Sequence, residues 1–119
     1  MSAIWGAIDL QRGISDDMRF RMRKSMRKFK IDGYREIVYG NEYFACGQQF
    51  FTKEAWRDNI PLYDEKRDIY FTADCVLNNR KELLELLKNH GAKMSDSCGD
   101  GELAYKAYVC WGEKFVENL

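Results

Sequence analysis

The chain has 119 residues, of which 45% are hydrophobic and 14% aromatic, and its nineteen basic side chains are balanced by nineteen acidic ones. This composition is that of a globular protein and excludes a disordered chain, and without a Pro-, Gly- or Ser-rich linker we expect one domain over residues 1–119. A formal net charge of zero gives no overall attraction to nucleic acid or to a membrane.

The sequence carries no pattern of a secretion signal or of a membrane span. The first residues lack a charged start followed by an apolar run, and no later stretch approaches the roughly 18 apolar residues that a span needs. We therefore expect a cytoplasmic protein. Four cysteines are widely spaced without a CxxC pair, and His90 is the one histidine, so we expect reduced, mostly buried thiols and no metal site. The cysteines are Cys46, Cys75, Cys98 and Cys110.

The N-terminal third predicts a strand followed by a helix. Residues 3–10 form an apolar run, and Ser15 can cap a helix that runs to about Lys30. Apolar side chains recur on one face of this helix, and we expect them to pack on a sheet while the basic face stays solvated. The apolar residues are Met18, Met22, Met26 and Phe29, and the basic ones are Arg19, Arg23, Arg27 and Lys30.

Two hairpins and two helices are expected in the remainder. Strands at 36–39 and 43–51 flank a Gly40-Asn41 turn, and a second hairpin joins 60–63 to 68–77. Asn78 or Asn79 caps a Leu-rich helix that ends near His90-Gly91, and a last helix starts at Glu102 and is interrupted at Gly112. This order favours an α+β fold, with antiparallel sheets packed with helices.

Several segments in the same order resemble the class II glutamine amidotransferase domain that begins asparagine synthetases. The start, Met-Ser-Ala-Ile-Trp-Gly, is similar to the family's Met-Cys-Gly-Ile-x-Gly, and residues 60–63 match its Gln-Pro-Leu-Tyr turn. Residues 71–78 resemble its Asn-Gly-Glu-Ile-Tyr-Asn strand end, and residues 97–102 and 112–119 resemble the segments Ser-Asp-x-Glu and Gly-x-x-Phe-Leu-x-x-Leu. The resemblance covers nearly the whole chain.

The resemblance implies part of the four-layer N-terminal nucleophile hydrolase fold, and it places four catalytic features on this sequence. Ser2 stands at the nucleophile position, where the family has the cysteine whose own amine serves as base. Gln48, or Gln49, stands where an arginine binds the substrate carboxylate, and Ala73-Asp74 replaces the Asn-Gly pair that stabilises the oxyanion. Asp100 matches the aspartate that binds the substrate's α-amine, although it is equally placed to cap the following helix.

These departures predict a degenerate amidotransferase module of asparagine biosynthesis, with a structural or interaction role and no useful glutaminase activity. They argue against glutamine as a ligand. The alternative is a serine-dependent glutaminase that supplies ammonia to an ATP-dependent amide-forming domain. No cofactor is expected in this segment, because ATP and Mg would belong to a downstream synthetase domain. We also expect the chain to be the N-terminal portion of its domain, with a homo-oligomer or that synthetase domain as partner.

Three other features of the sequence have ordinary structural explanations. The basic run at 19–30 is of the kind that binds nucleic acid or acidic lipid, but it is also the solvated face of an amphipathic helix, which we favour. His90 has no sequence signal that brings it near a thiol. The loop at 95–101 lacks the lysine and spacing of a phosphate-binding loop, so it is better explained as a capped helix start.

Overall fold

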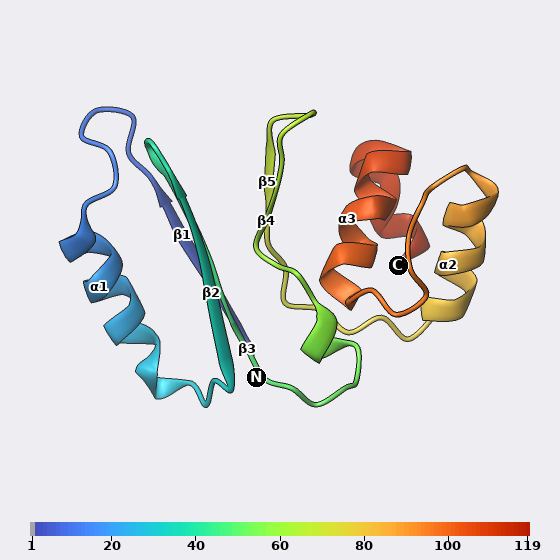
Figure 1. Cartoon of the computed structure of the whole chain (residues 1–119), viewed down its shortest axis with the longest axis horizontal. Coiled ribbons are helices and arrows are strands. Elements are labelled where there is room, and N and C mark those ends of the chain that lie inside the picture. The colour runs from blue at the N-terminus through green and yellow to red at the C-terminus, as the bar shows by residue number, and fades with distance from the viewer. Residues whose placement is uncertain (1) are drawn as a thin grey trace. The chain divides into compact units, whose positions relative to one another are not determined.

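The computed structural model describes residues 2–119, and in this part of the chain antiparallel strands form two sheets that accompany three α-helices (Figure 1). The predicted α+β class is confirmed. The chain divides into two compact units. Unit 1 contains the described residues up to Phe51 together with Ile60–Asp74, and unit 2 contains Thr52–Asn59 and Cys75–Leu119. We describe each unit separately.

Unit 1 is built on a three-stranded antiparallel sheet whose order is β1-β3-β2. Its strands are β1 (Ala3–Ile8), β2 (Gly33–Tyr39) and β3 (Glu42–Gln48), and the predicted hairpin across Gly40 joins the last two. Gly6 has a steric reason to be glycine, because a Cβ atom there would lie 2.4 Å from the carbonyl oxygen of Tyr43. The Gly in the Met-x-x-Ile-x-Gly start thus lets β1 lie close to β3.

Helix α1 (Asp16–Ser25) lies along one face of this sheet (Figure 1). Ser15 caps it as predicted, since its Oγ accepts a hydrogen bond from the Met18 N–H at 3.1 Å. The predicted end at Lys30 was too late. The Ser25 hydroxyl donates to the Met22 carbonyl, and the chain tightens into a 3₁₀ turn over Met26–Lys28 before it becomes extended at Phe29.

The predicted apolar face of α1 is the one that meets the sheet. Met22, Met26 and Phe29 pack against a core of Ala3, Trp5, Tyr43 and Ala45, although the three side chains themselves are only half-buried. Met18, the fourth residue of the predicted face, is not part of this cluster. Trp5 and Tyr43 are tied by a hydrogen bond from the indole nitrogen to the phenol oxygen at 3.0 Å. The helix therefore covers the β1–β3 pair by its apolar face.

A short hairpin packs on the opposite face of the sheet, against strands β2 and β3 (Figure 1). It consists of β4 (Leu62–Asp64) and β5 (Ile69–Phe71), and it follows a cis Ile60–Pro61 peptide bond. Its rings continue a stack across the two sheets, with centroid distances of 6.2 Å for Tyr39–Tyr63, 4.4 Å for Tyr63–Tyr70 and 5.5 Å for Tyr70–Phe44. Stacked rings of this kind add to the stability that apolar burial gives.

The predicted strand at 68–77 was too long. Pairing ends at Phe71 because β4 offers three residues as partners. Beyond that point the backbone groups have other partners. The Ala73 carbonyl accepts from the Cys46 thiol, and the Leu77 N–H donates to the carboxylate of Asp100. The apolar run at 68–77 therefore predicted a strand where the structure has an extended segment whose backbone groups bond to side chains.

Unit 2 is helical and contains both helices that the sequence predicts. Helix α2 (Arg80–Asn89) and helix α3 (Asp100–Trp111) bury Leu83, Leu87 and Leu103 completely. Asn79 occupies the N-cap position of α2, but its side chain donates to the carbonyl of Asn118 instead. Gly112, at φ +61°, ends α3, and a 3₁₀ segment (Gly112–Asn118) follows.

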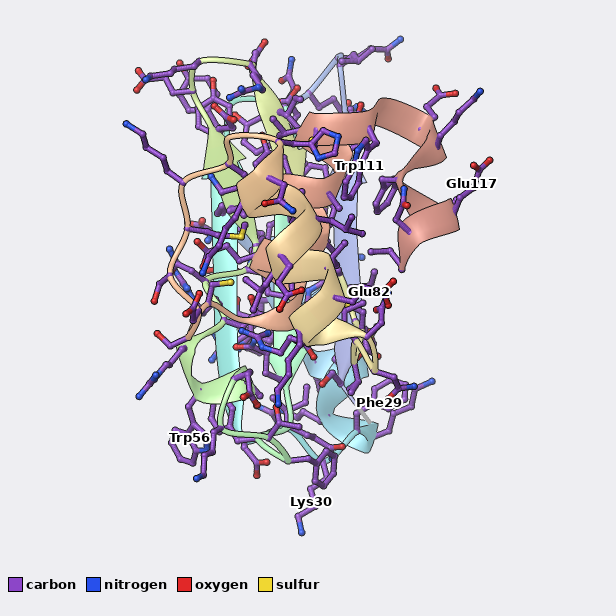
Figure 2. The ribbon with its side chains drawn as sticks, turned by 90° about the vertical axis from the view of Figure 1, so that its right-hand side faces the viewer. Phe29, Lys30, Trp56, Glu82, Trp111 and Glu117 are labelled. Carbon is purple, nitrogen blue, oxygen red and sulfur yellow. The ribbon has the colours of Figure 1, made fainter. Side chains whose placement is uncertain are left out.

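The surface of unit 2 carries one large exposed aromatic side chain in its first segment. Trp56 lies in a 3₁₀ turn (Ala55–Arg57), points away from the ribbon (Figure 2) and is 70% exposed. Trp111 instead packs its ring edge-to-face with His90, at a centroid distance of 5.6 Å. Cys98 is buried in this unit and Cys110 is half-buried, and no disulfide joins the cysteines among residues 2–119.

We predict that Met22→Asp destabilises unit 1 by about 2 kcal/mol or more, because a carboxylate would replace the apolar contact with the Trp5–Tyr43 core and would lose part of its hydration there. Lys24→Asp is the matched control, since Lys24 is exposed on the same helix. Its cost should stay below about 1 kcal/mol, from the unfavourable charge near the helix C-terminus. Urea unfolding midpoints measure both, and equal losses would contradict the packing of α1.

Candidate functional site

Ser2 lies at the start of β1, beside the end of β3. Its neighbour Ala3 pairs with Gly47, and the Ser2 Oγ accepts a hydrogen bond from the Gln49 N–H at 3.1 Å. The side chain is half-buried. The structure therefore brings Ser2 together with the Gln48–Gln49 segment, and it uses the hydroxyl oxygen to satisfy a backbone donor where β3 stops.

Gln48 and Gln49 are buried, at 7% and 8% exposure. The Gln49 amide nitrogen donates to the carbonyl of Lys30, while its oxygen Oε1 is buried without a hydrogen-bond partner in the described part of the chain. Both side chains are neutral amides. At the position that the resemblance assigns to carboxylate binding, the structure thus has buried polar groups and no guanidinium.

Ala73 is held against the same face of β3 on which Gln48 lies. The Cys46 thiol points to the Ala73 carbonyl at 3.9 Å, and Cys46 and Gln48 share a face because they are two residues apart on a strand. Asp74 is exposed. At the two oxyanion positions the chain therefore presents a methyl group and a solvated carboxylate, and neither side chain can donate a hydrogen bond when Asp74 is ionised.

Asp100 is the first residue of α3 and is 7% exposed. Its Oδ1 atom forms an ion pair with the Arg80 guanidinium at 2.5 Å, and its Oδ2 atom accepts a hydrogen bond from the Leu77 N–H at 3.0 Å. Arg80 also donates to the carbonyls of Asp96 and Cys98. Both carboxylate oxygens of Asp100 are therefore occupied within unit 2, in a charge-assisted network that fixes the loop before α3.

The N-terminus of α3 is capped by Asp58, which the sequence analysis did not identify. Its Oδ2 atom accepts the Gly101 N–H at 2.8 Å, and its Oδ1 atom accepts the Glu102 N–H at 3.1 Å. Gly99 makes this approach possible, because a Cβ atom there would lie 2.2 Å from the Asp58 side chain. Asp58 precedes the helix by about forty residues, so no local pattern signals its role.

Burial raises the pKa of Asp58 above its ordinary value of 3.8, and the two backbone hydrogen bonds oppose this effect. The nearby Asp100 and Glu102 charges raise the pKa further. Helix N-termini normally favour an ionised acid. At Asp58 the loss of hydration outweighs that preference, so ionising the buried carboxyl group costs more free energy in the folded protein than in the unfolded chain.

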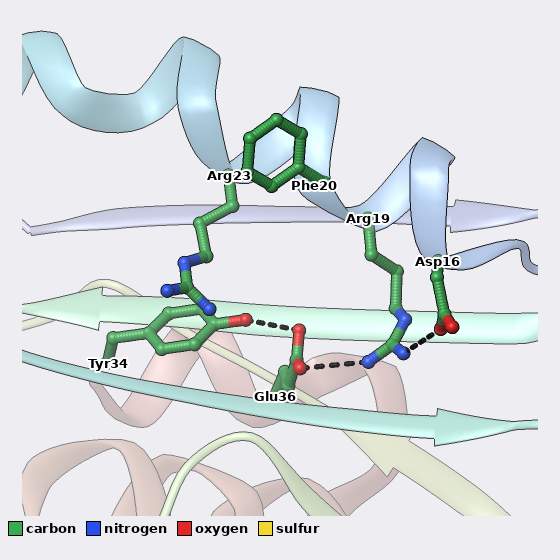
Figure 3. A pocket seen from close by; sticks show the side chains of 6 residues that line it. All are labelled: Asp16, Arg19, Phe20, Arg23, Tyr34 and Glu36. Atoms are coloured by element: carbon green, nitrogen blue, oxygen red, sulfur yellow. Dashed lines mark hydrogen bonds and ion pairs between the residues drawn. The ribbon is translucent and has the colours of Figure 1, made fainter.

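A second polar cluster lies between α1 and β2 (Figure 3). Arg19 forms an ion pair with Glu36 at 2.9 Å and another with Asp16, while Tyr34 donates to Glu36. Arg19 was expected to stay solvated with the other basic residues of the helix, and that expectation was wrong, because Glu36 on β2 faces it. Burial, followed by the bond to Glu36, raises the pKa of Tyr34, so the phenol stays protonated.

The described residues offer no ready place for a metal ion. No group of three or more His, Cys, Asp or Glu side chains converges anywhere in residues 2–119. His90 is exposed, and its Nδ1 atom lies 2.8 Å from the Leu86 carbonyl oxygen. None of the helices in the same part of the chain has the length and apolar character that crossing a bilayer requires.

Comparison with known proteins gives one informative match. Over 112 aligned residues the chain is 28% identical to an asparagine synthetase (glutamine-hydrolysing) of Triphysaria versicolor. The alignment covers 90% of this chain and 19% of that protein. No protein-family profile matches the chain, and no solved structure matches it. The chain is thus similar to asparagine synthetase over nearly all of its length, and it spans about a fifth of that relative.

We predict a pH signature of the Asp58 cap. Because the pKa of Asp58 is raised in the folded protein, the folded chain holds this proton above pH 3.8 while the unfolded chain loses it. The contribution of Asp58 to the free energy of unfolding therefore falls as the pH rises through the raised pKa, and it is constant at higher pH. Asp58→Asn removes this titration and keeps the size of the side chain.

The measurement is the free energy of unfolding of both proteins from pH 3 upward, at matched salt. The advantage of wild type over Asp58→Asn should shrink as the pH rises from the ordinary aspartate pKa, and the acids that do not interact with Asp58 cancel in the difference. If the stability advantage of wild type grows as the pH rises above the ordinary aspartate pKa, the prediction is wrong. The two backbone hydrogen bonds to Asp58 would then lower its pKa by more than burial raises it.

Proposed function

We propose that this chain is an asparagine synthetase-like domain in which the glutamine site has lost its chemistry and the fold has kept a structural or interaction role. Residues 1–119 would form the N-terminal portion of a glutamine amidotransferase type 2-like domain, with part of the N-terminal nucleophile hydrolase fold. The similarity to asparagine synthetase and the antiparallel sheet between α1 and the β4–β5 hairpin support this assignment.

The occupied carboxylate of Asp100 carries the proposal. The resemblance assigns this residue to the α-amine of glutamine, but both of its oxygens are already bound, one of them by Arg80. A guanidinium in that place would repel an incoming ammonium group, and freeing the carboxylate would leave the Arg80 charge without a carboxylate partner while its side chain is 15% exposed. Asp100 therefore serves unit 2 as a structural anion.

The positions in unit 1 support the same conclusion. Ser2 retains a hydroxyl but has it bonded to the Gln49 N–H, and serine is a weaker nucleophile than cysteine at neutral pH. Gln48 supplies no cation for a substrate carboxylate. Ala73 removes an oxyanion donor, which typically costs about 3–4 kcal/mol of barrier. No cofactor is required by any of these side chains.

The competing function is a serine-dependent glutaminase that feeds ammonia to an ATP- and Mg-dependent synthetase domain. The observation in its favour is the place of Ser2, whose hydroxyl lies at the end of β3 next to the buried, polar Gln48–Gln49 pair. An N-terminal serine with a free amine can act as nucleophile with its own base.

The exposed apolar side chains of β1 suggest where a partner binds. β1 is an edge strand, and Ile4 and Ile8 on one of its faces are 45% and 64% exposed. Unpaired strand edges with exposed apolar residues favour association. We propose that a second copy or a synthetase domain covers this face. The molar mass of the isolated chain from light scattering tests whether a second copy binds there. A monomeric mass would exclude the second copy and leave the synthetase domain as the proposed partner.

We predict that the protein with Met1 removed releases no measurable ammonia from glutamine, and that Ser2→Cys alone does not restore turnover. Residues of one catalytic unit contribute together, so a restored thiol lacks its substrate contacts. Ser2→Cys combined with Gln48→Arg, Ala73→Asn and Asp74→Gly should exceed Ser2→Cys. Mass spectrometry confirms the processed N-terminus before each assay.

Ser2→Ala is the control that separates the two proposed functions. If the unmodified protein hydrolyses glutamine and Ser2→Ala abolishes this, the chain is a serine glutaminase and the degenerate-module proposal is wrong. Turnover that survives in Ser2→Ala comes from a contaminating enzyme.

A further inference from the structure

The face of α1 that looks toward β2 encloses a second hollow beside the cluster of Figure 3. This hollow has a volume of about 340 Å³. It shares Arg23 and Tyr34 with the charged hollow of about 270 Å³ that Figure 3 shows. Its lining is mostly apolar and aromatic, with two arginines: Trp5, Arg23, Met26, Arg27, Phe29, Ile31 and Tyr34. Pockets of this size and lining are typical of sites for small organic molecules.

The aromatic part of this lining is held rigidly. Trp5 and Tyr34 stack with their centroids 5.7 Å apart and their planes 10° from parallel. The Trp5 indole N–H is bound to the Tyr43 hydroxyl at 3.0 Å, so it does not need a partner from outside. Trp5 is itself only 8% exposed, so the stacked pair forms a rigid base beneath the hollow, and little conformational entropy is lost when an apolar group packs over it.

The charge at the rim is uncompensated. Arg23 and Arg27 are exposed, and among residues 2–119 neither forms an ion pair with a carboxylate. The two acids that line the neighbouring hollow with Arg23, Glu36 and Asp16, are both paired with Arg19. The Arg23 guanidinium lies over the Tyr34 ring, with its carbon 4.8 Å from the centroid. This contact holds one guanidinium above the aromatic surface.

We propose that this groove binds a small organic carboxylate with a flat apolar body. The body would lie over the Trp5–Tyr34 base, against the apolar side chains of Met26, Phe29 and Ile31. The carboxylate would meet the guanidinium groups of Arg23 and Arg27, which match carboxylates in a fork geometry. The apolar lining disfavours inorganic phosphate, and the limited volume disfavours a nucleic-acid strand. The site involves none of the residues of the proposed amidotransferase pocket, so the two proposals stand or fall separately.

The test uses indoleacetate as the probe, with indoleacetamide as its neutral counterpart and acetate as the anion without a body. Two-dimensional NMR follows the side-chain N–H signal of Trp5, and those of Trp56 and Trp111 in unit 2 serve as internal references. Indoleacetate should shift the Trp5 signal saturably. Indoleacetamide should bind roughly tenfold more weakly, because a charge-assisted pair is lost, and acetate should cause no saturable shift.

Substitutions on α1 test which cationic side chains bind the carboxylate of the probe. Arg23→Gln and Arg27→Gln should each weaken indoleacetate binding several-fold, whereas Lys24→Gln, on the same helix and exposed, should leave it unchanged. Equal affinity for indoleacetate and indoleacetamide, equal binding by all three variants, or no shift of Trp5 up to the solubility limit would each overturn the proposal. A short RNA that shifts Trp5 where indoleacetate does not would identify the basic face as a nucleic-acid surface instead.

Discussion

Strand β3 is paired on both edges, and this double pairing determines where the other elements of unit 1 lie. Its side chains alternate between two covered faces, with Tyr43 and Ala45 under α1 and with Phe44 and Cys46 toward the β4–β5 hairpin. A shift of one residue in its register would exchange the two faces and put Tyr43 under the hairpin. The same register places Gln49 beside Ser2, so the candidate site depends on β3 as much as the core does.

Asp58 and Asp100 are both parts of the scaffold of unit 2. In unit 2 the loop before α3 is fixed by Asp58 from one direction and by the Arg80–Asp100 pair from another. Removing one member of a buried pair leaves an unpaired charge, which is more costly than never having had the pair. Asp100 therefore has a structural role in unit 2 whether or not the chain binds glutamine.

The sequence predicted the elements that depend on local signals. Ser15, Gly40 and Gly112 marked a cap, a turn and a helix end, and the Met22–Met26 face identified the packed side of α1. Contacts between distant segments were not visible. Arg19 looked solvated because Glu36 is seventeen residues away, and the strand expected up to Leu77 ends at Phe71, where its pairing with β4 ends. Asp58 gave no signal, because nothing local ties it to the helix that it caps. The roles of Ser2, Gln48, Ala73 and Asp74 came from the resemblance and remain proposals.

The most direct test of the lost chemistry is covalent labelling of Ser2 by a diazoketone analogue of glutamine, read by intact-mass and peptide mass spectrometry. Labelling needs both a bound α-amino acid and an activated nucleophile, so it reports on binding and reactivity without requiring turnover. The account predicts no adduct on the protein with a free Ser2 amine, even at analogue concentrations far above those that label an active amidotransferase. A stoichiometric adduct on Ser2 that glutamine protects against would contradict it.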